Sequence, residues 1–284
     1  MKNDTGQKLN FVFWGTPEVA SETLEILKES GYIPSLIVTS PDKPQGRRML
    51  ITPPPVKVWA IQNNIPCVQP EKLDEEFSNK LKAISHKLSI VVAYGKIIPE
   101  EIINMPKLGS INIHYSLLPK YRGASPVEST ILNGDIETGI SIQKMVYKMD
   151  AGPIITEEKI NIHPDEKALE LKNRLIKIGG DLLVKILPDL IEGKTKEVAQ
   201  NESQVTFCKK IKKEDGLIDL NDNATKNYNK FRAFASWPRI FFFQNNKRII
   251  ITDATLENNE FKIKKVLPEG RKEIKYEDFL KTSI

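Results

Sequence analysis

The feature that most constrains the fold of this chain is an alternation of apolar, β-type runs with helical stretches along its first two thirds. The runs are FVFWG (11–15), IPSLIVTS (33–40), LSIVVAYG (88–95) and GSINIH (109–114). The third run is almost unbroken, which is typical of a strand that is covered on both faces. This alternation predicts an α/β domain with a doubly wound, mostly parallel, Rossmann-like sheet. Functional groups should then lie at the carboxyl ends of its strands.

Helical patterns fill the spaces between these runs. We expect a first helix capped by Thr16 and further helices over 56–63, 73–86 and 165–192, the last of which ends at Gly193. A strand pair is expected over 138–146 and 152–162. The segment 41–55 contains five prolines, and we expect it to be an irregular loop.

The sequence pattern changes at Phe207, where short β-type runs separated by turn residues begin. The residues QNNK between two apolar runs are typical of a hairpin turn. We therefore expect a catalytic domain over 1–193, a linker over 194–206 and a small all-β barrel (OB-like) over 207–284. The last segment has 17 Lys and Arg against 11 Asp and Glu, a net charge of +6, while the rest of the chain is close to neutral. This surplus favours a polyanionic partner such as a nucleic acid, although a solvated lysine-rich surface would also produce it.

The candidate site lies at the end of the strand SINIH. Asn112 and His114 are two residues apart and therefore point to the same face of this strand. An asparagine amide can donate to the negative oxygen of a tetrahedral intermediate, and histidine can move a proton near neutral pH. Asp150, in KMDAGPI, supplies a carboxylate. This set is typical of acyl transfer to an amine that attacks directly, although a satisfied polar pair in the core would explain Asn112 and His114 as well.

Several motifs resemble those of a known family. NIHYSLLPKYRGASP and DAGPI are similar to the signatures of the 10-formyltetrahydrofolate-dependent formyltransferases. FWGTPEVA, TSPDKPQGRR, VVAYGKIIP and WPRIFF are similar to motifs of the members that act on methionyl-tRNA. The resemblance extends from Phe11 to near the end of the chain.

The resemblance implies a role for each matching residue. Asn112 would stabilise the oxyanion on the formyl carbon, His114 would relay the proton of the attacking amine, and Asp150 would hold the imidazole in the right tautomer. The segment expected to contact the folate consists of Ser116, Leu117, Leu118 and Pro119. The implied reaction moves a formyl group from 10-formyltetrahydrofolate, a co-substrate, to the amino group of methionyl-initiator tRNA.

The proline-rich segment resembles the insertion that enters the acceptor end of the tRNA in this family. Its cations, Lys43, Arg47 and Arg48, suit contact with phosphates. Three other readings stay open. In the first, the acceptor is an amino sugar on a nucleotide. In the second, water hydrolyses the formyl-folate at the same three residues. In the third, the chain is a tRNA-binding module without activity.

The remaining features predict an ordinary intracellular protein. Cys67 and Cys208 lack a C-x-x-C spacing, so we expect reduced thiols and no metal. No apolar run is long enough to span a membrane, and we expect a cytoplasmic monomer. We also expect His86 and His163 to have no catalytic role, with His86 at the surface, and Trp237 to lie in the core of the barrel.

Overall fold

The computed structural model describes residues 9–46 and 48–281. It forms two compact units. The first contains the chain up to Arg122 together with Gly139–Lys159 and Asn173–Val205. The second contains Gly123–Thr138, Ile160–Lys172 and the chain from Thr206 onward. The predicted domain boundaries at 193 and 207 stay a prediction, because this grouping assigns two earlier segments to the unit of the C-terminal sheet.

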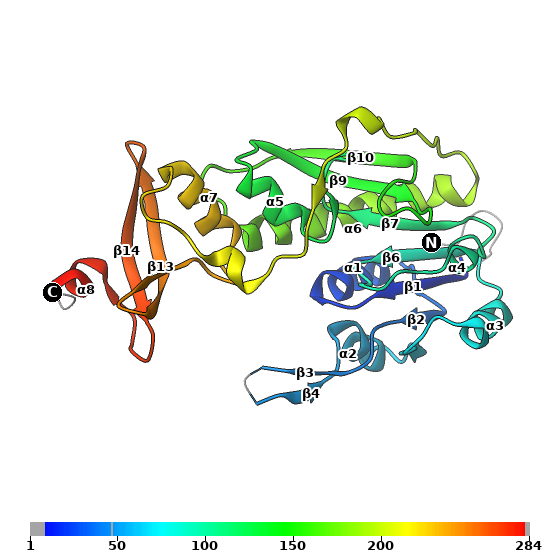
Figure 1. Cartoon of the computed structure of the whole chain (residues 1–284). Coiled ribbons are helices and arrows are strands. Elements are labelled where there is room, and N and C mark those ends of the chain that lie inside the picture. The colour runs from blue at the N-terminus through cyan, green and yellow to red at the C-terminus, as the bar shows by residue number, and fades with distance from the viewer. Residues whose placement is uncertain (1–8, 47, 282–284) are drawn as a thin grey trace. The chain divides into compact units, whose positions relative to one another are not determined.

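The first unit is built on a seven-stranded sheet with the order β10-β9-β7-β6-β1-β2-β5 (Figure 1). Strands β5, β2, β1, β6 and β7 are parallel, and β9 runs antiparallel to β7. This confirms the mostly parallel sheet predicted from the sequence. The strands are β1 (Phe11–Gly15), β2 (Leu36–Val38), β5 (Cys67–Val68), β6 (Leu88–Val92), β7 (Ser110–His114), β9 (Glu137–Lys144) and β10 (Ile154–Asn161).

Helices cover both faces of this sheet, as a doubly wound fold requires. On one face, α6 packs closely on α1, because a Cβ at Gly180 would lie only 2.5 Å from Ile26 of α1. On the other face, Val12 and Trp14 pack in a core cluster with Leu81 and Ile102. The helices of this unit are α1 (Glu18–Glu29), α2 (Pro55–Gln62), α3 (Glu75–Ile84), α4 (Glu100–Ile103) and α6 (Ala168–Ile191).

Two predictions about secondary structure in the first unit were wrong. The proline-rich segment is not an irregular loop, because β3 (Lys43–Gln45) and β4 (Leu50–Thr52) pair as an antiparallel hairpin. An isolated two-stranded ribbon tolerates the missing N–H of Pro44, since one side of each strand has no partner strand. Thr16 does not cap α1 either; Pro17 is the N-cap residue, and the Thr16 hydroxyl donates to the carbonyl of Tyr94 instead.

The second unit contains a four-stranded antiparallel sheet with the order β12-β13-β14-β15. This confirms an antiparallel β module at the C-terminus, and the hairpin turn falls at Asn245 and Asn246, as QNNK predicted. The strands are β12 (Phe241–Gln244), β13 (Lys247–Glu257), β14 (Glu260–Pro268) and β15 (Ile274–Lys275). The shorter elements outside the two main sheets are β8 (Arg122–Gly123), β11 (Phe207–Cys208), α5 (Pro126–Leu132) and α8 (Tyr276–Lys281).

The module is not all-β, because helix α7 (Ala224–Ala233) precedes the sheet and packs on α5. Asn223 caps this helix by accepting the N–H of Lys226. Trp237, expected in the core, is 55% exposed. Across the residues that the structure describes, no helix has the length and apolar character needed to cross a membrane.

Candidate active site

The end of β7 and the neighbouring strand β9 form the candidate site. Asn112 lies opposite Gln143 of β9, and His114 lies opposite Ser141. Residues directly opposite in an antiparallel pair project to the same face, so these four side chains share one side of the sheet. The sequence pattern identified the two residues on β7 but not their partners on β9, although the polar alternation of Ser141 and Gln143 within an apolar strand was the available signal.

The orientation of the His114 ring is fixed by a backbone carbonyl. Nε2 of His114 lies 2.9 Å from the carbonyl oxygen of Tyr121, and the side chain is buried. A carbonyl oxygen only accepts, so Nε2 carries a proton and Nδ1 is the basic nitrogen of the neutral ring. The tautomer is therefore set by Tyr121 and not by Asp150 alone.

Asp150 lies beside this basic nitrogen. Its Oδ1 is 3.7 Å from Nδ1 of His114, which is longer than a hydrogen bond. The carboxylate therefore faces Nδ1 without a direct hydrogen bond to it. Gln143 donates to the same Oδ1 through its Nε2 at 3.1 Å, which orients the carboxylate. The structure thus brings Asn112, His114 and Asp150 into one site, from strand β7 and from the turn that follows β9 in the first unit.

The amide of Asn112 is free to meet a substrate. Asn112 is half-buried, and its side chain makes no hydrogen bond to any residue within 9–46 and 48–281. A half-buried amide without a protein partner is costly unless a ligand or solvent uses it. It is available to donate to a developing oxyanion.

The segment Ser116–Pro119, predicted to contact folate, is held by its own hydrogen bonds. The Ser116 hydroxyl donates to the carbonyl of Lys120 at 2.6 Å, and the N–H of Leu118 donates to the Ser141 hydroxyl at 2.9 Å. Ser116, Leu118 and Pro119 are buried, while Leu117 is half-exposed. Leu117 is therefore the member of this segment whose side chain can reach a ligand.

The predicted RNA-contacting cations lie on the β3–β4 hairpin. Lys43 and Arg48 are exposed, and Arg47 lies outside the described residues. The same hairpin exposes three consecutive apolar side chains, Met49, Leu50 and Ile51, each with about two thirds of its surface accessible (66%, 64% and 67%). The hairpin thus combines cations with an uncovered apolar strand.

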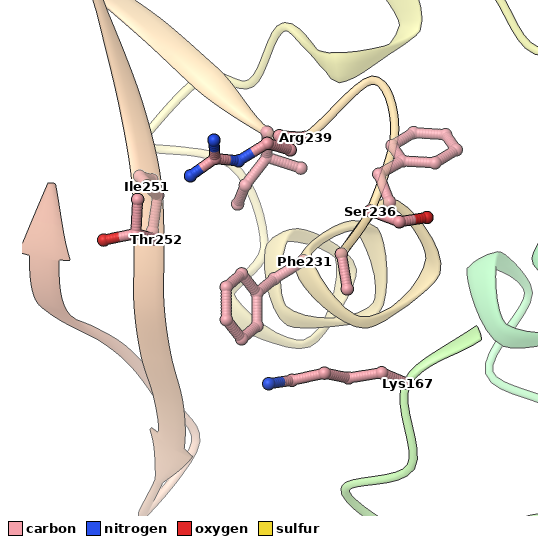
Figure 2. Close-up of a pocket in the computed structure, with 9 residues that line it drawn as sticks. Lys167, Phe231, Ser236, Arg239, Ile251 and Thr252 are labelled. Atoms are coloured by element: carbon pink, nitrogen blue, oxygen red, sulfur yellow. The ribbon is translucent and has the colours of Figure 1, made fainter. Parts of the chain in front are cut away.

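A separate pocket of about 280 Å³ lies within the second unit (Figure 2). It is lined by Lys167 before α6, by Phe231 of α7, by Arg239 and by Ile251 and Thr252 of β13. The ammonium of Lys167 lies 5.6 Å from the centre of the Phe231 ring. Among the described residues, Lys167 and Arg239 have no carboxylate partner, so this pocket presents two uncompensated cations.

His86 does not lie at the surface, contrary to the prediction. It is buried, and the Ser89 hydroxyl lies 3.0 Å from its Nε2. Burial lowers the pKa of His86 to about 4, so the ring is neutral at physiological pH. His163 is exposed in the loop before α6. Within the described part of the chain Cys67 and Cys208 form no disulfide, as expected, and burial raises the pKa of the Cys67 thiol to about 11.

Comparison with known proteins gives two family matches along the chain. A family described as formyl transferase matches residues 7–187, and the family described as formyl transferase, C-terminal domain, matches residues 210–277. The two together cover most of the chain.

Individual relatives agree with these matches. The chain is 40% identical over 258 residues to the methionyl-tRNA formyltransferase of Caldicellulosiruptor saccharolyticus, covering 89% of this chain and 82% of the relative. It is 36% identical over 299 residues to that of Halalkalibacterium halodurans, covering 96% and 94%. The fold is similar to that of an N-formyltransferase from Helicobacter canadensis in complex with folinic acid and dTDP-3-aminofucose, with a TM-score of 0.66, 20% identity and 88% of each chain covered.

Proposed function

The chain belongs to the methionyl-tRNA formyltransferase family, and we infer from this that it transfers a formyl group to the α-amino group of methionine on initiator tRNA. We propose 10-formyltetrahydrofolate as the formyl donor. A formyl amide on a folate nitrogen offers a carbonyl carbon for attack, and the structurally similar protein from Helicobacter canadensis binds folinic acid, a formyl folate.

The observation that carries the proposed mechanism is the convergence of an amide, an imidazole and a carboxylate. Asn112 offers a donor that has no partner among the described residues, His114 offers Nδ1 as a base, and Asp150 lies 3.7 Å from that nitrogen. The site needs no nucleophilic side chain, because the amine of the acceptor can attack the formyl carbon itself.

Each residue has one task in the reaction. As the amine attacks, the carbonyl oxygen becomes negative, and the Asn112 amide donates a hydrogen bond to it. Nδ1 of His114 takes the proton that the amine loses, and Asp150 stabilises the resulting imidazolium. The bond between the formyl carbon and the folate nitrogen then breaks, and its electron pair stays on that nitrogen. His114 gives the same proton to the nitrogen, so the imidazole returns to its neutral form.

We further propose that Ser116–Pro119 borders the folate, with Leu117 as the contacting side chain. Lys43, Arg47 and Arg48 would contact phosphates of the tRNA, and the exposed apolar strand of the hairpin would pack on unpaired bases at its end. In the second unit, Lys167 and Arg239 offer a further pair of cations for the RNA backbone. We also propose that the protein acts as a monomer in the cytoplasm.

The experiment is a transfer assay with the formyl group of the donor radiolabelled. Charged initiator tRNA, uncharged tRNA, an amino-sugar nucleotide and a no-acceptor control are run side by side. Label on charged tRNA alone supports the proposed function. Label on the sugar nucleotide, or formate released without an acceptor, would replace it with one of the two other reactions that the same three residues can perform.

A further inference from the structure

A partly buried hydrogen-bonded chain lies behind the carboxylate of Asp150, and no part of the reaction described above uses it. It begins at Arg122, whose side chain is fully buried. The guanidinium donates through Nε and Nη2 to Oε1 of Gln200 at 3.0 and 2.7 Å. Nη2 also pairs with Glu202 at 2.8 Å. Arg122 thus meets a carboxylate on one side and a neutral amide on the other.

Gln200 connects the arginine to the turn that carries Asp150. Its Nε2 donates to the backbone carbonyls of Asp150 and Gly152 at 2.9 and 2.7 Å. It also lies 3.4 Å from Oε1 of Gln143, whose own Nε2 donates to the Asp150 carboxylate. The chain therefore runs Arg122, Gln200, Gln143, Asp150 within the first unit.

The direction of every bond in this chain is determined. Arg122 has only donors, so it must face the oxygen of Gln200, and the amide nitrogen of Gln200 must then face the carbonyls. If the Gln200 amide were rotated by 180°, its NH2 group would face the donors of Arg122. Its oxygen would then face the carbonyl oxygens of Asp150 and Gly152. The buried cation therefore fixes which end of Gln200 holds Asp150.

The backbone conformation of the turn requires stabilising hydrogen bonds. Asp150 has a φ of +50°, in the left-handed region that side chains other than glycine rarely adopt. This conformation is costly for a residue with a Cβ and persists where surrounding bonds impose it. Two of those bonds come from Gln200.

We infer that Gln200 and Arg122 are positioning residues of the formyl-transfer site: they hold the Asp150 turn so that its carboxylate faces Nδ1 of His114. The inference rests on the proposed function. Neither residue touches a reacting atom. Arg122 acts by polarising and orienting Gln200, and Gln200 acts by fixing the backbone on both sides of Ala151.

The test compares kcat and KM of Gln200→Leu with those of Gln204→Leu, a matched control in the same segment with an exposed side chain. We expect kcat of Gln200→Leu to fall about 10- to 100-fold, the loss typical of a catalytic group misplaced by about 1 Å. The KM values of Gln200→Leu for both substrates should change less than about twofold. The control Gln204→Leu should keep both kcat and KM within about twofold of the wild type.

Gln200→Leu combined with Asp150→Asn separates positioning from a general structural effect. If Gln200 acts through Asp150, the double variant is no slower than Asp150→Asn alone, because residues that act as a unit are not additive. Losses that multiply would overturn the inference, as would a wild-type kcat for Gln200→Leu.

A second variant keeps the inference testable if Gln200→Leu does not fold. Gln200→Glu has the same shape and forms an ion pair with Arg122, but presents acceptors to the two backbone carbonyls. We expect it to fold and to lose kcat as Gln200→Leu does, and a wild-type kcat contradicts the inference. Formylation of methionyl-tRNA by the wild type in the same assay tests the proposed function separately. An inactive wild type would contradict the proposed function. An active wild type with variants of equal kcat would contradict only the positioning role.

Discussion

At the scale of single residues, the site depends on which nitrogen of His114 is basic. The bond from Nε2 to the Tyr121 carbonyl leaves Nδ1 facing Asp150, and Asn112 lies on the same face of β7 without a partner among the described residues. The neutral imidazole can therefore accept a proton only on the side of the carboxylate. The amide and the base thus have separate tasks at one carbonyl carbon.

Asn112→Ala tests the amide by itself. We expect turnover to fall about 100-fold or more, the loss typical of one oxyanion donor, with little change in folate binding. Steady-state formylation and fluorescence titration with a folate measure the two quantities. Wild-type turnover in a folded Asn112→Ala protein would remove this residue from the mechanism.

His86 gives a prediction about acid stability. The folded state keeps His86 neutral until the pH falls to about 4, while the unfolded chain binds the proton near pH 6.5. The unfolded state is therefore favoured as the pH falls from about 6.5 to about 4, by up to about 1.4 kcal/mol per pH unit. His86→Gln, which cannot titrate, should flatten the decline of the free energy of unfolding in this window, measured by urea denaturation.

The control for this variant is His163→Gln, because His163 is exposed. Its free energy of unfolding should follow the wild-type dependence on pH. Parallel curves for wild type and His86→Gln between pH 6.5 and 4 would show that His86 does not produce the acid sensitivity.

At the scale of secondary structure elements, the turn between β9 and β10 places Asp150. A Cβ at Gly152 would lie 1.7 Å from the carbonyl oxygen of Lys144, so only glycine fits. Gly152→Ala should lower the free energy of unfolding by about 1–3 kcal/mol, as forced overpacking does, and should reduce kcat by displacing Asp150. Thermal unfolding and steady-state kinetics measure both.

Gly270→Ala is the matched control for Gly152→Ala. This variant also adds a methyl group. Gly270 has a φ of +71°, but no atom of the described residues lies within 4 Å of its Cβ position. We expect a loss of stability of about 1–2 kcal/mol with unchanged kcat. Equal kcat values for the two glycine variants would argue against the turn as the element that places the acid.

Much of the fold at this scale could be predicted, because buried parallel strands are continuous apolar runs and long helices keep a regular period. The sheet around β1 and β6 and the long helix α6 were predicted on these grounds. Helix α7 was missed because its sequence, ATKNYNKFRA, is polar and includes two asparagines, which are poor helix formers. Its Asn223 cap and its packing on α5 stabilise it.

Only those site residues could be predicted that a local sequence pattern or motif contains. Asn112 and His114 share a strand, so their common face follows from alternation. Asp150 was named as a carboxylate in a turn between two predicted strands, and the resemblance supplied its role. Gln143 and Gln200 were not predicted, since their roles depend on strand register and on a contact from a distant segment. Neither is visible in local sequence.

At the scale of the whole molecule, the enzyme must bind a large polyanion as well as a small donor. Lys43→Glu with Arg48→Glu should raise KM for methionyl-tRNA about 10-fold or more and leave KM for the folate unchanged. Each lost phosphate contact should also reduce the slope of log KM against log salt by about 0.7–0.9, because fewer counterions are released. Formylation kinetics between low and moderate salt measure this slope.

The same measurement on Lys167→Gln with Arg239→Gln examines the second unit, with the exposed Lys272→Gln as its control. We expect a smaller salt slope for the double variant and the wild-type slope for the control. Identical slopes would show that the pocket of the second unit does not contact the RNA backbone. For the hairpin variant, Lys43→Glu with Arg48→Glu, a rise in KM for the folate would show that the hairpin contributes to binding of the formyl donor.

The most direct test of the mechanism is the single-turnover rate of formyl transfer by His114→Ala, with both substrates bound at saturation. If the imidazole receives the proton of the attacking amine, this rate falls about 100-fold or more, while thermal unfolding and binding of both substrates match those of the wild type. A folded, substrate-saturated His114→Ala enzyme that transfers the formyl group at the wild-type rate would contradict it.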